Sequence, residues 1–244
     1  MQLPVERSEN LTSARQQTIA GSNNDTRESS SPGNGDYLEE KAEGAFEPTP
    51  DTVSTPMLRL TLDQINPIKA NGKGDGSVYH STYEILAVHL WRCACKARGL
   101  LDDQLTKLYV ATDGRSRLSP PLPPGYSGNV VFTATPIAKS GELRYEPLAN
   151  TTRRIHKELT KMDDLYLRPT YFSSPNLNIN SWTRLPIYDA DFGWGRPIFM
   201  GPASILYEGT IYVIPCATGD RSVWLAVCLG SSHMNLFRKY LYEF

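Results

Sequence analysis

From about residue 57 onward, some apolar residues recur every three or four positions, which predicts helices, and others form short β-rich runs, which predict strands. The clearest helical stripe has i, i+3, i+4, i+7, i+8 spacing and consists of Ala87, Leu90, Trp91, Ala94 and Cys95. Ser81 and Glu84 precede this stripe in the pattern of a capping box, and Gly99 follows it as a stop signal. The pattern therefore predicts one well-delimited helix over residues 81–98.

The remaining elements are predicted from shorter patterns. A helix over residues 62–70 contains Pro67, which should end or kink it, and further helices are expected over residues 148–162 and after Ser232 as N-cap. Strands are expected at residues 57–61, 106–112, 128–135, 205–215 and 221–229. The turn at residues 218–220 would join the last two strands into an antiparallel hairpin. This irregular alternation predicts a mixed α/β layer fold.

Residues 1–54 differ from the rest of the chain in composition. They are rich in Ser, Asn, Asp, Glu, Thr, Gly and Pro, most markedly over residues 29–36. Such a segment buries too little apolar surface to offset its ordering entropy, so a disordered low-complexity tail is expected there. The pattern leaves open whether this tail also has a regulatory or targeting role. A folded domain is expected over residues 55–244.

Charge and cysteine content exclude several function classes. The 25 basic and 26 acidic residues give a net charge of −1, without the basic excess that is typical of nucleic-acid binding. The four cysteines are too few for a disulfide scaffold and form no CxxC pair, so reduced thiols and no metal site are expected. No apolar stretch reaches the ~18 residues of a membrane span, and a cytoplasmic protein with no membrane partner is expected.

One short motif carries more functional information than any other segment. Residues 191–195 read Asp-Phe-Gly-Trp-Gly and are followed by Arg196 and Pro197. Other specific blocks follow one another in a fixed order at residues 81–84, 89–92, 95–100, 111–118, 121–129, 174–177 and 180–186. Through these blocks the chain resembles the C-terminal half of the plant BAHD acyltransferases, and among them the hydroxycinnamoyltransferases.

The resemblance implies a fold and a reaction. The fold would be a mixed sheet with flanking helices, as in the chloramphenicol-acetyltransferase-like C-terminal domain of BAHD enzymes. The reaction would move a hydroxycinnamoyl group, such as p-coumaroyl, from coenzyme A to shikimate or quinate in phenylpropanoid metabolism. Acyl-CoA would be a co-substrate, the acceptor a small hydroxylated molecule, and no bound cofactor would be needed.

The family's general base is not found in this sequence. In BAHD enzymes that base is the histidine of a His-x-x-x-Asp motif, whereas the residues four positions after the histidines here are Glu84, Cys93, Thr160 and Phe237. The family also has about one more helix between Arg168 and Pro169, which indicates an internal deletion. We therefore expect the chain to be inactive alone; the alternative is a non-catalytic pseudoenzyme that binds acyl-CoA or a full-length homologue.

The resemblance also assigns site residues. Those implied for coenzyme A are Ser81, Thr82, Thr112, Asp113, Gly114, Arg115, Arg117, Ser181, Thr183 and Arg184. Trp182 would donate to the oxyanion, although a buried structural aromatic is equally open, and Arg168 would bind the acceptor carboxylate. Asp191, with the motif residues Phe192, Gly193, Trp194 and Gly195, is expected to have a structural role. Its carboxylate would pair with Arg115 or Arg184.

Several of these residues also have a simpler interpretation. Ser81 and Thr82 would serve a helix cap, and Arg115 and Arg117 would be solvated surface charges. Among the histidines, His89 should pack within its helix, while His156 and His233 should lie on helix surfaces. His80 adjoins the coenzyme A segment but has no catalytic counterpart in the family.

Overall fold

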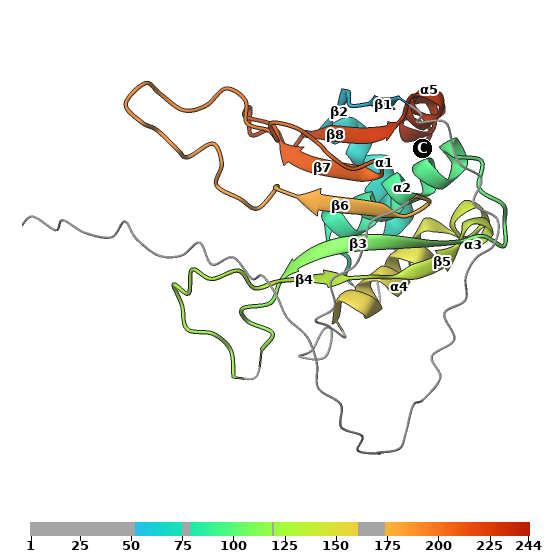
Figure 1. Ribbon diagram of the computed structural model, residues 1–244, viewed down its shortest axis with the longest axis horizontal. Helices are drawn as coiled ribbons and strands as arrows, with labels where there is room; N and C mark the ends of the chain where they lie inside the picture. Colours follow the sequence, from blue (N-terminus) through green and yellow to red (C-terminus); the bar gives the residue numbers. More distant parts are fainter. Residues whose placement is uncertain (1–51, 75–78, 119, 161–173) are drawn as a thin grey trace, which may run out of the picture. The chain divides into compact units, whose positions relative to one another are not determined.

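The computed structural model describes residues 52–74, 79–118, 120–160 and 174–244 (Figure 1). The tail expected at residues 1–54 lies outside this part except for its last three residues, and so does the deletion expected at Arg168. Val53 and Ser54 form the short strand β1, which pairs with β8, so the folded unit begins slightly before residue 55. No helix within these described ranges is long and apolar enough to cross a membrane.

The described strands join in one mixed sheet with the order β1-β8-β7-β6-β3-β4, while β2 also pairs with β8 and β5 with β3. The strands are β1 Val53–Ser54, β2 Met57–Leu60, β3 Leu105–Asp113, β4 Val131–Ala134, β5 Ile137–Lys139, β6 Leu177–Ser181, β7 Thr210–Pro215 and β8 Val223–Gly230. β6 is parallel to both β3 and β7, and the other pairs are antiparallel. The mixed sheet expected from the resemblance is confirmed.

Helices flank this sheet, and α2 is the central one. The described helices are α1 Leu62–Gly72, α2 Thr82–Ala97, α3 Ser140–Tyr145, α4 Leu148–Thr160 and α5 Ser231–Leu241. Helix α2 contacts each of the other four helices and strand β6. Its capping box at Ser81 and Glu84 is present, and Gly99 adopts a φ of 61°, which a residue with a side chain disfavours. The predicted helix is thus confirmed at both ends.

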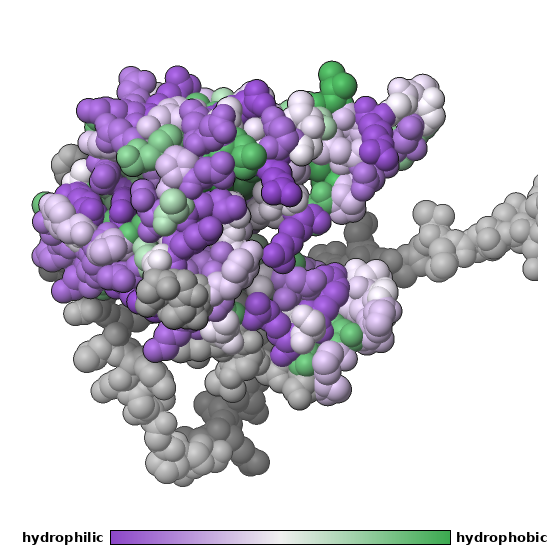
Figure 2. Space-filling model, turned by 180° about the vertical axis from the view of Figure 1, so that it is seen from behind, coloured by the Kyte–Doolittle hydropathy of each residue, from purple (hydrophilic) through white to green (hydrophobic). Residues whose placement is uncertain are grey.

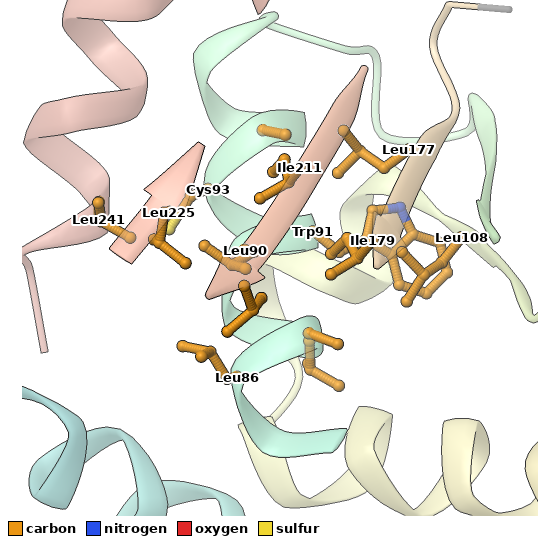
Figure 3. Close-up of a cluster of buried hydrophobic side chains, with 14 of the residues drawn as sticks. Leu86, Leu90, Trp91, Cys93, Leu108, Leu177, Ile179, Ile211, Leu225 and Leu241 are labelled. Atoms are coloured by element: carbon orange, nitrogen blue, oxygen red, sulfur yellow. The ribbon is translucent and has the colours of Figure 1, made fainter. Parts of the chain in front are cut away.

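The hydrophobic core lies between α2 and the strands. Figure 3 shows Leu86, Leu90, Trp91 and Cys93 of α2 beside Leu108, Leu177, Ile179, Ile211 and Leu225 of four strands, with Leu241 of α5. Trp91 is 1% exposed, and its indole N–H donates to the Thr106 hydroxyl at 3.1 Å. A buried indole therefore has the partner that its N–H group requires.

Three of the differences from the predicted boundaries have a clear physical reason. Pro67 lies inside α1 without ending it; the flanking Ile65 and Ile68 are each 2% exposed, so core packing holds the helix together. Helix α5 is preceded by Gly230 as N-cap rather than Ser232, because β8 passes directly into it. Strand β7 begins only at residue 210, because Gly209 has a φ of 84° that breaks the extended run.

A buried ion pair joins the end of α2 to β6 and β7. The Arg98 guanidinium donates to both carboxylate oxygens of Glu208, at 2.7 and 2.9 Å, and to the carbonyl of Pro175 at 2.8 Å. The Arg98 side chain is 3% exposed and that of Glu208 is 27% exposed. Since Glu208 precedes β7 and Pro175 precedes β6, the pair fixes the start of both strands to the helix.

The segment that connects β6 to β7, residues 182–209, extends away from the sheet (Figure 1). Its exposed large apolar side chains are Leu185, Phe192, Trp194, Ile198, Phe199, Leu206 and Tyr207. Figure 2 shows hydrophobic side chains on this projection, at its upper right, among polar ones. Trp194 and Ile198 are each 93% exposed, so little of the described chain covers them.

Candidate functional site

The parallel pairing of β3 and β6 brings two of the expected coenzyme A segments together. Leu108 of β3 is opposite Leu177 of β6, so the carboxyl ends of the two strands meet at one edge of the sheet. A pocket of about 470 Å³ lies there, in the size range of small-molecule sites. Its lining is Ser81, Tyr83, Glu84, Val110, Ala111, Thr112, Asp113, Arg117, His156, Leu159, Thr160, Ser181, Thr183 and Arg184.

The start of α2 forms one wall of this pocket. The Ser81 hydroxyl accepts the backbone N–H of Glu84 at 3.2 Å, and the Glu84 carboxylate accepts the backbone N–H of Ser81 at 2.6 Å. Partial burial alone would raise the pKa of Glu84, but hydrogen bonds from Ser81 and His156 outweigh it and lower that pKa. Because the predicted capping box occupies two N–H groups of this helix end, fewer remain for an anion.

Two arginines supply positive charge at the pocket. Arg117 donates to the carbonyl of Leu159 at 2.6 Å, and neither Arg117 nor Arg184 pairs with a carboxylate among the residues that the structure describes. Both side chains are exposed. An unpaired guanidinium with planar donors suits phosphate oxygens, so the arrangement can hold a phosphorylated ligand.

Arg115 is held by contacts within the β3–β4 loop. Its guanidinium binds the Asp113 carboxylate at 3.0 Å and the carbonyls of Tyr126 and Gly128 at 3.1 and 2.9 Å. The backbone N–H of Arg115 lowers the pKa of Asp113. Arg115 and Gly114 do not line the pocket; a Cβ on Gly114 would lie 2.1 Å from the Phe132 ring. These residues shape the β3–β4 loop beside the site.

The serine and threonines expected at the site divide between two pockets. Ser181 and Thr183 line the main pocket, and their hydroxyls lie 2.8 Å apart. Thr82 instead lines a separate pocket of about 280 Å³, which Thr183 also borders. Thr112 lies at the end of β3 in the main pocket. Of these four hydroxyl-bearing residues, Thr183 therefore lines both pockets.

Trp182 lies immediately after β6, between the two hydroxyl-bearing residues of the pocket. Its ring meets that of Tyr212 edge to face at a centroid distance of 5.4 Å, and its backbone N–H donates to Val213 at 2.8 Å. The indole is half-buried and has no hydrogen-bond partner within the described ranges. An indole in this position can donate its N–H to a ligand.

Asp191 organises the loop of its own motif. One carboxylate oxygen accepts the backbone N–H groups of Gly193 and Gly195, at 2.8 and 3.1 Å. Both glycines have a positive φ, 95° and 96°, which explains the need for glycine at each position. In the described part of the chain neither expected arginine pairs with Asp191: Arg115 is bound to Asp113, and Arg184 lines the pocket. Phe192 and Trp194 are exposed at 80% and 93%.

A cluster beside the pocket was not indicated by the sequence. His80, Glu84 and His156 bring ligand-type atoms within 4.8 Å of one another. His156, expected on the surface, is half-buried, and its Nδ1 lies 2.7 Å from a Glu84 oxygen. Glu84 and His156 are separated by 72 residues, so no local signal reveals the pair. By contrast, His89 packs in α2 as expected, 6% exposed, with Nε2 2.9 Å from the Leu241 carbonyl.

The structure thus brings together seven of the eleven residues expected for coenzyme A and the acceptor. They are Ser81, Thr112, Asp113, Arg117, Ser181, Thr183 and Arg184. Thr82, Gly114 and Arg115 do not line this pocket, and Arg168 lies outside the described residues. Sequence reasoning missed Tyr83 and His156; the Tyr83 hydroxyl donates to the Ile179 carbonyl at 2.8 Å.

Plant hydroxycinnamoyltransferases are among the known proteins with similar sequences. The chain is 51% identical to shikimate O-hydroxycinnamoyltransferase of Nicotiana tabacum, over 81% of this chain and 50% of that protein. It is 48% identical to a hydroxycinnamoyltransferase of Narcissus pseudonarcissus, over 81% of this chain and 48% of the relative. The chain spans about half the length of the curated relatives it matches.

Solved structures share the fold at low sequence identity. TRI101 of F. sporotrichioides, complexed with coenzyme A and T-2, matches with a TM-score of 0.67 and 19% identity, over 78% of this chain and 49% of that one. Vinorine synthase matches with a TM-score of 0.62 and 18% identity, over 75% of this chain and 46% of that one. The sequence pattern of the Transferase family matches residues 15–244. The chain therefore belongs to the Transferase family, that of the BAHD acyltransferases.

Proposed function

We propose that this chain is the coenzyme A-binding half of a hydroxycinnamoyltransferase. The intact enzyme would move a hydroxycinnamoyl group, such as p-coumaroyl, from coenzyme A to the hydroxyl of shikimate or quinate, in the cytoplasm. One observation carries the proposal: the ends of β3 and β6 and the start of α2 converge on one pocket with two exposed arginines, Arg117 and Arg184, that pair with no carboxylate among the described residues. The identity to hydroxycinnamoyltransferases supports the choice of acyl group.

In this proposal the arginines hold phosphate oxygens of acyl-CoA, while Ser181 and Thr183 add hydroxyl donors. The thioester would lie near Trp182, and its indole N–H, which has no partner among the described residues, would stabilise the tetrahedral oxyanion. The acceptor carboxylate would bind Arg168. The proton of the attacking hydroxyl must go to a base, and the histidine of a His-x-x-x-Asp motif in another half would take it. The chain alone would then bind acyl-CoA without turning it over.

Calorimetric titration of the purified 244-residue chain with coenzyme A tests the pocket. Replacement of either pocket arginine, Arg117→Gln or Arg184→Gln, should weaken binding about tenfold, the loss of roughly one charge-assisted hydrogen bond. Arg238→Gln is the matched control, since Arg238 is exposed on α5 away from the pocket. Unchanged affinity in both pocket variants would place coenzyme A elsewhere.

The inactivity of the chain alone has its own test. The chain is incubated with p-coumaroyl-CoA and shikimate, and ester formation is followed by chromatography. No product above the uncatalysed rate is expected. Turnover by the isolated chain would mean that a group other than a His-x-x-x-Asp histidine acts as base.

A second candidate is a non-catalytic protein that binds acyl-CoA and associates with a full-length homologue. It is favoured by the apolar side chains exposed on residues 182–209, because a patch of this kind often marks a protein interface. Co-purification with a tagged full-length hydroxycinnamoyltransferase would support it. A strictly monomeric chain that does not co-purify would argue against it.

A further inference from the structure

We infer that His80, Glu84 and His156 form a binding site for a single Zn²⁺ ion at the side of the pocket. The three side chains come from the residue before the α2 N-cap, the first turn of α2 and the middle of α4. Each offers one ligand atom, and these atoms all lie within 4.8 Å of one another. The site goes beyond the proposed function, which requires no metal.

The donor set matches the preference of zinc. Two imidazoles and one carboxylate are a common three-residue zinc set, which leaves a fourth position open for water. Ligand atoms in a tetrahedral zinc site, with bonds of about 2.0–2.1 Å, are about 3.3 Å apart. The Nδ1 of His156 and Oε1 of Glu84 are 2.7 Å apart, so binding would open this pair by about 0.6 Å and replace their hydrogen bond with bonds to the ion. The other gaps would close by up to about 1.5 Å through side-chain rotations.

One nitrogen of His80 is available to an ion. His80 is 8% exposed, and its Nδ1 is buried without a hydrogen-bond partner among the described residues. Buried polar atoms without a partner are rare in folded proteins, and each one calls for an explanation. A bound metal ion would provide the partner for an imidazole nitrogen that the protein does not supply.

The carboxylate is already held in a ligating position. Its Oε2 accepts the backbone N–H of Ser81 at 2.6 Å, which leaves Oε1 facing His156. Such a hydrogen bond to the non-ligating oxygen fixes the orientation of a metal ligand. The negative charge of Glu84 would also offset the nearby positive charge of Arg153, which acts on His80.

The cysteines do not compete for the ion in the folded chain. Cys93, Cys95, Cys216 and Cys228 are all buried. Burial raises the pKa of Cys93 to about 12 and that of Cys95 to about 11, so their thiols stay protonated. Because thiolate is the form that binds zinc, the histidine–glutamate cluster is the favoured site. Glu84 and His156 line the pocket, so the open position of the ion would face it.

Titration with Zn²⁺ alone tests the inference. The metal-free 244-residue chain is titrated in competition with a colorimetric chelator, and one ion per chain is expected. His80→Gln, His156→Gln and Glu84→Gln should each weaken binding at least about tenfold. The glutamine at position 84 can still accept the Ser81 N–H, so that variant keeps the helix cap while removing the charge. His233→Gln, on α5, is the control and should bind as the parent does.

A second measurement distinguishes this site from thiol binding. Co²⁺ replaces Zn²⁺, and its absorption spectrum should show a tetrahedral d–d band without a thiolate charge-transfer band. Far-UV circular dichroism confirms that each variant is folded. A thiolate band would overturn the inference, and so would the lack of stoichiometric Zn²⁺ binding or an affinity unchanged from the parent chain in all three cluster variants.

Discussion

Replacing Glu208 with glutamine should lower the free energy of unfolding by about 3 kcal/mol, because Arg98 would keep a buried charge without its partner. Removing one partner of a buried ion pair costs about 3–5 kcal/mol. The Arg98 side chain is 3% exposed but that of Glu208 is 27% exposed, which favours the lower end of this range. The Pro175 carbonyl would still accept from Arg98, which also limits the loss. For a domain of this size the melting temperature should fall by about 6–12 °C.

Urea unfolding followed by circular dichroism measures this change, with the slope of the transition as a check on two-state behaviour. The control is Glu243→Gln, which removes a 3.9 Å pair with Lys239 whose side chains are 66% and 50% exposed. An exposed i,i+4 pair of this kind contributes about 0.3–0.5 kcal/mol. A loss below about 1 kcal/mol in Glu208→Gln would mean that the Arg98 pair is solvated and does not fix the starts of β6 and β7.

Three further changes have expected outcomes. Gly114→Ala should destabilise the chain by about 1–3 kcal/mol in thermal melts, since its Cβ would lie 2.1 Å from Phe132; an unchanged melt would show that the ring moves aside. Burial lowers the pKa of His89, so the unfolded chain binds the proton more readily, and stability should fall as pH drops below about 6.5. His89→Gln should reduce that slope in urea midpoints measured against pH, and an identical slope would contradict this assignment. Ser81→Ala should cost about 1 kcal/mol through loss of the α2 cap, as measured by urea unfolding, and no loss would show that Glu84 alone suffices.

Helix ends were predicted where the sequence has a local capping or stop signal. The capping box at Ser81 and the glycine at position 99 both lie within one turn of α2, and the helix has these ends. Strand β6, Leu177–Ser181, was not predicted, because it is short and half polar. Its extended conformation depends on parallel pairing with β3 and β7, which are far away in the sequence.

The candidate site was also predicted only in part, because some of its contacts join residues that are far apart in the sequence. The resemblance indicated the coenzyme A segments, and parallel strand pairing explains why they meet. The cluster with His156 could not be predicted, because Glu84 was interpreted as a cap and His156 as a surface residue. Their contact depends on the packing of α2 against α4. Side chains that have one local role can acquire a second one only when the tertiary structure is formed.

The pairing of β2 with β8 has a consequence for synthesis on the ribosome. Met57 is opposite Ala226, so 169 further residues must be synthesised before β2 can pair with β8. At about 5–20 residues per second this delay is on the order of 10–30 s. During that time β2 has an unpaired edge on the side that β8 will occupy, and the α2 surface that packs on Leu225 and Leu241 is uncovered. We expect nascent chains to need chaperone protection until β8 has been translated.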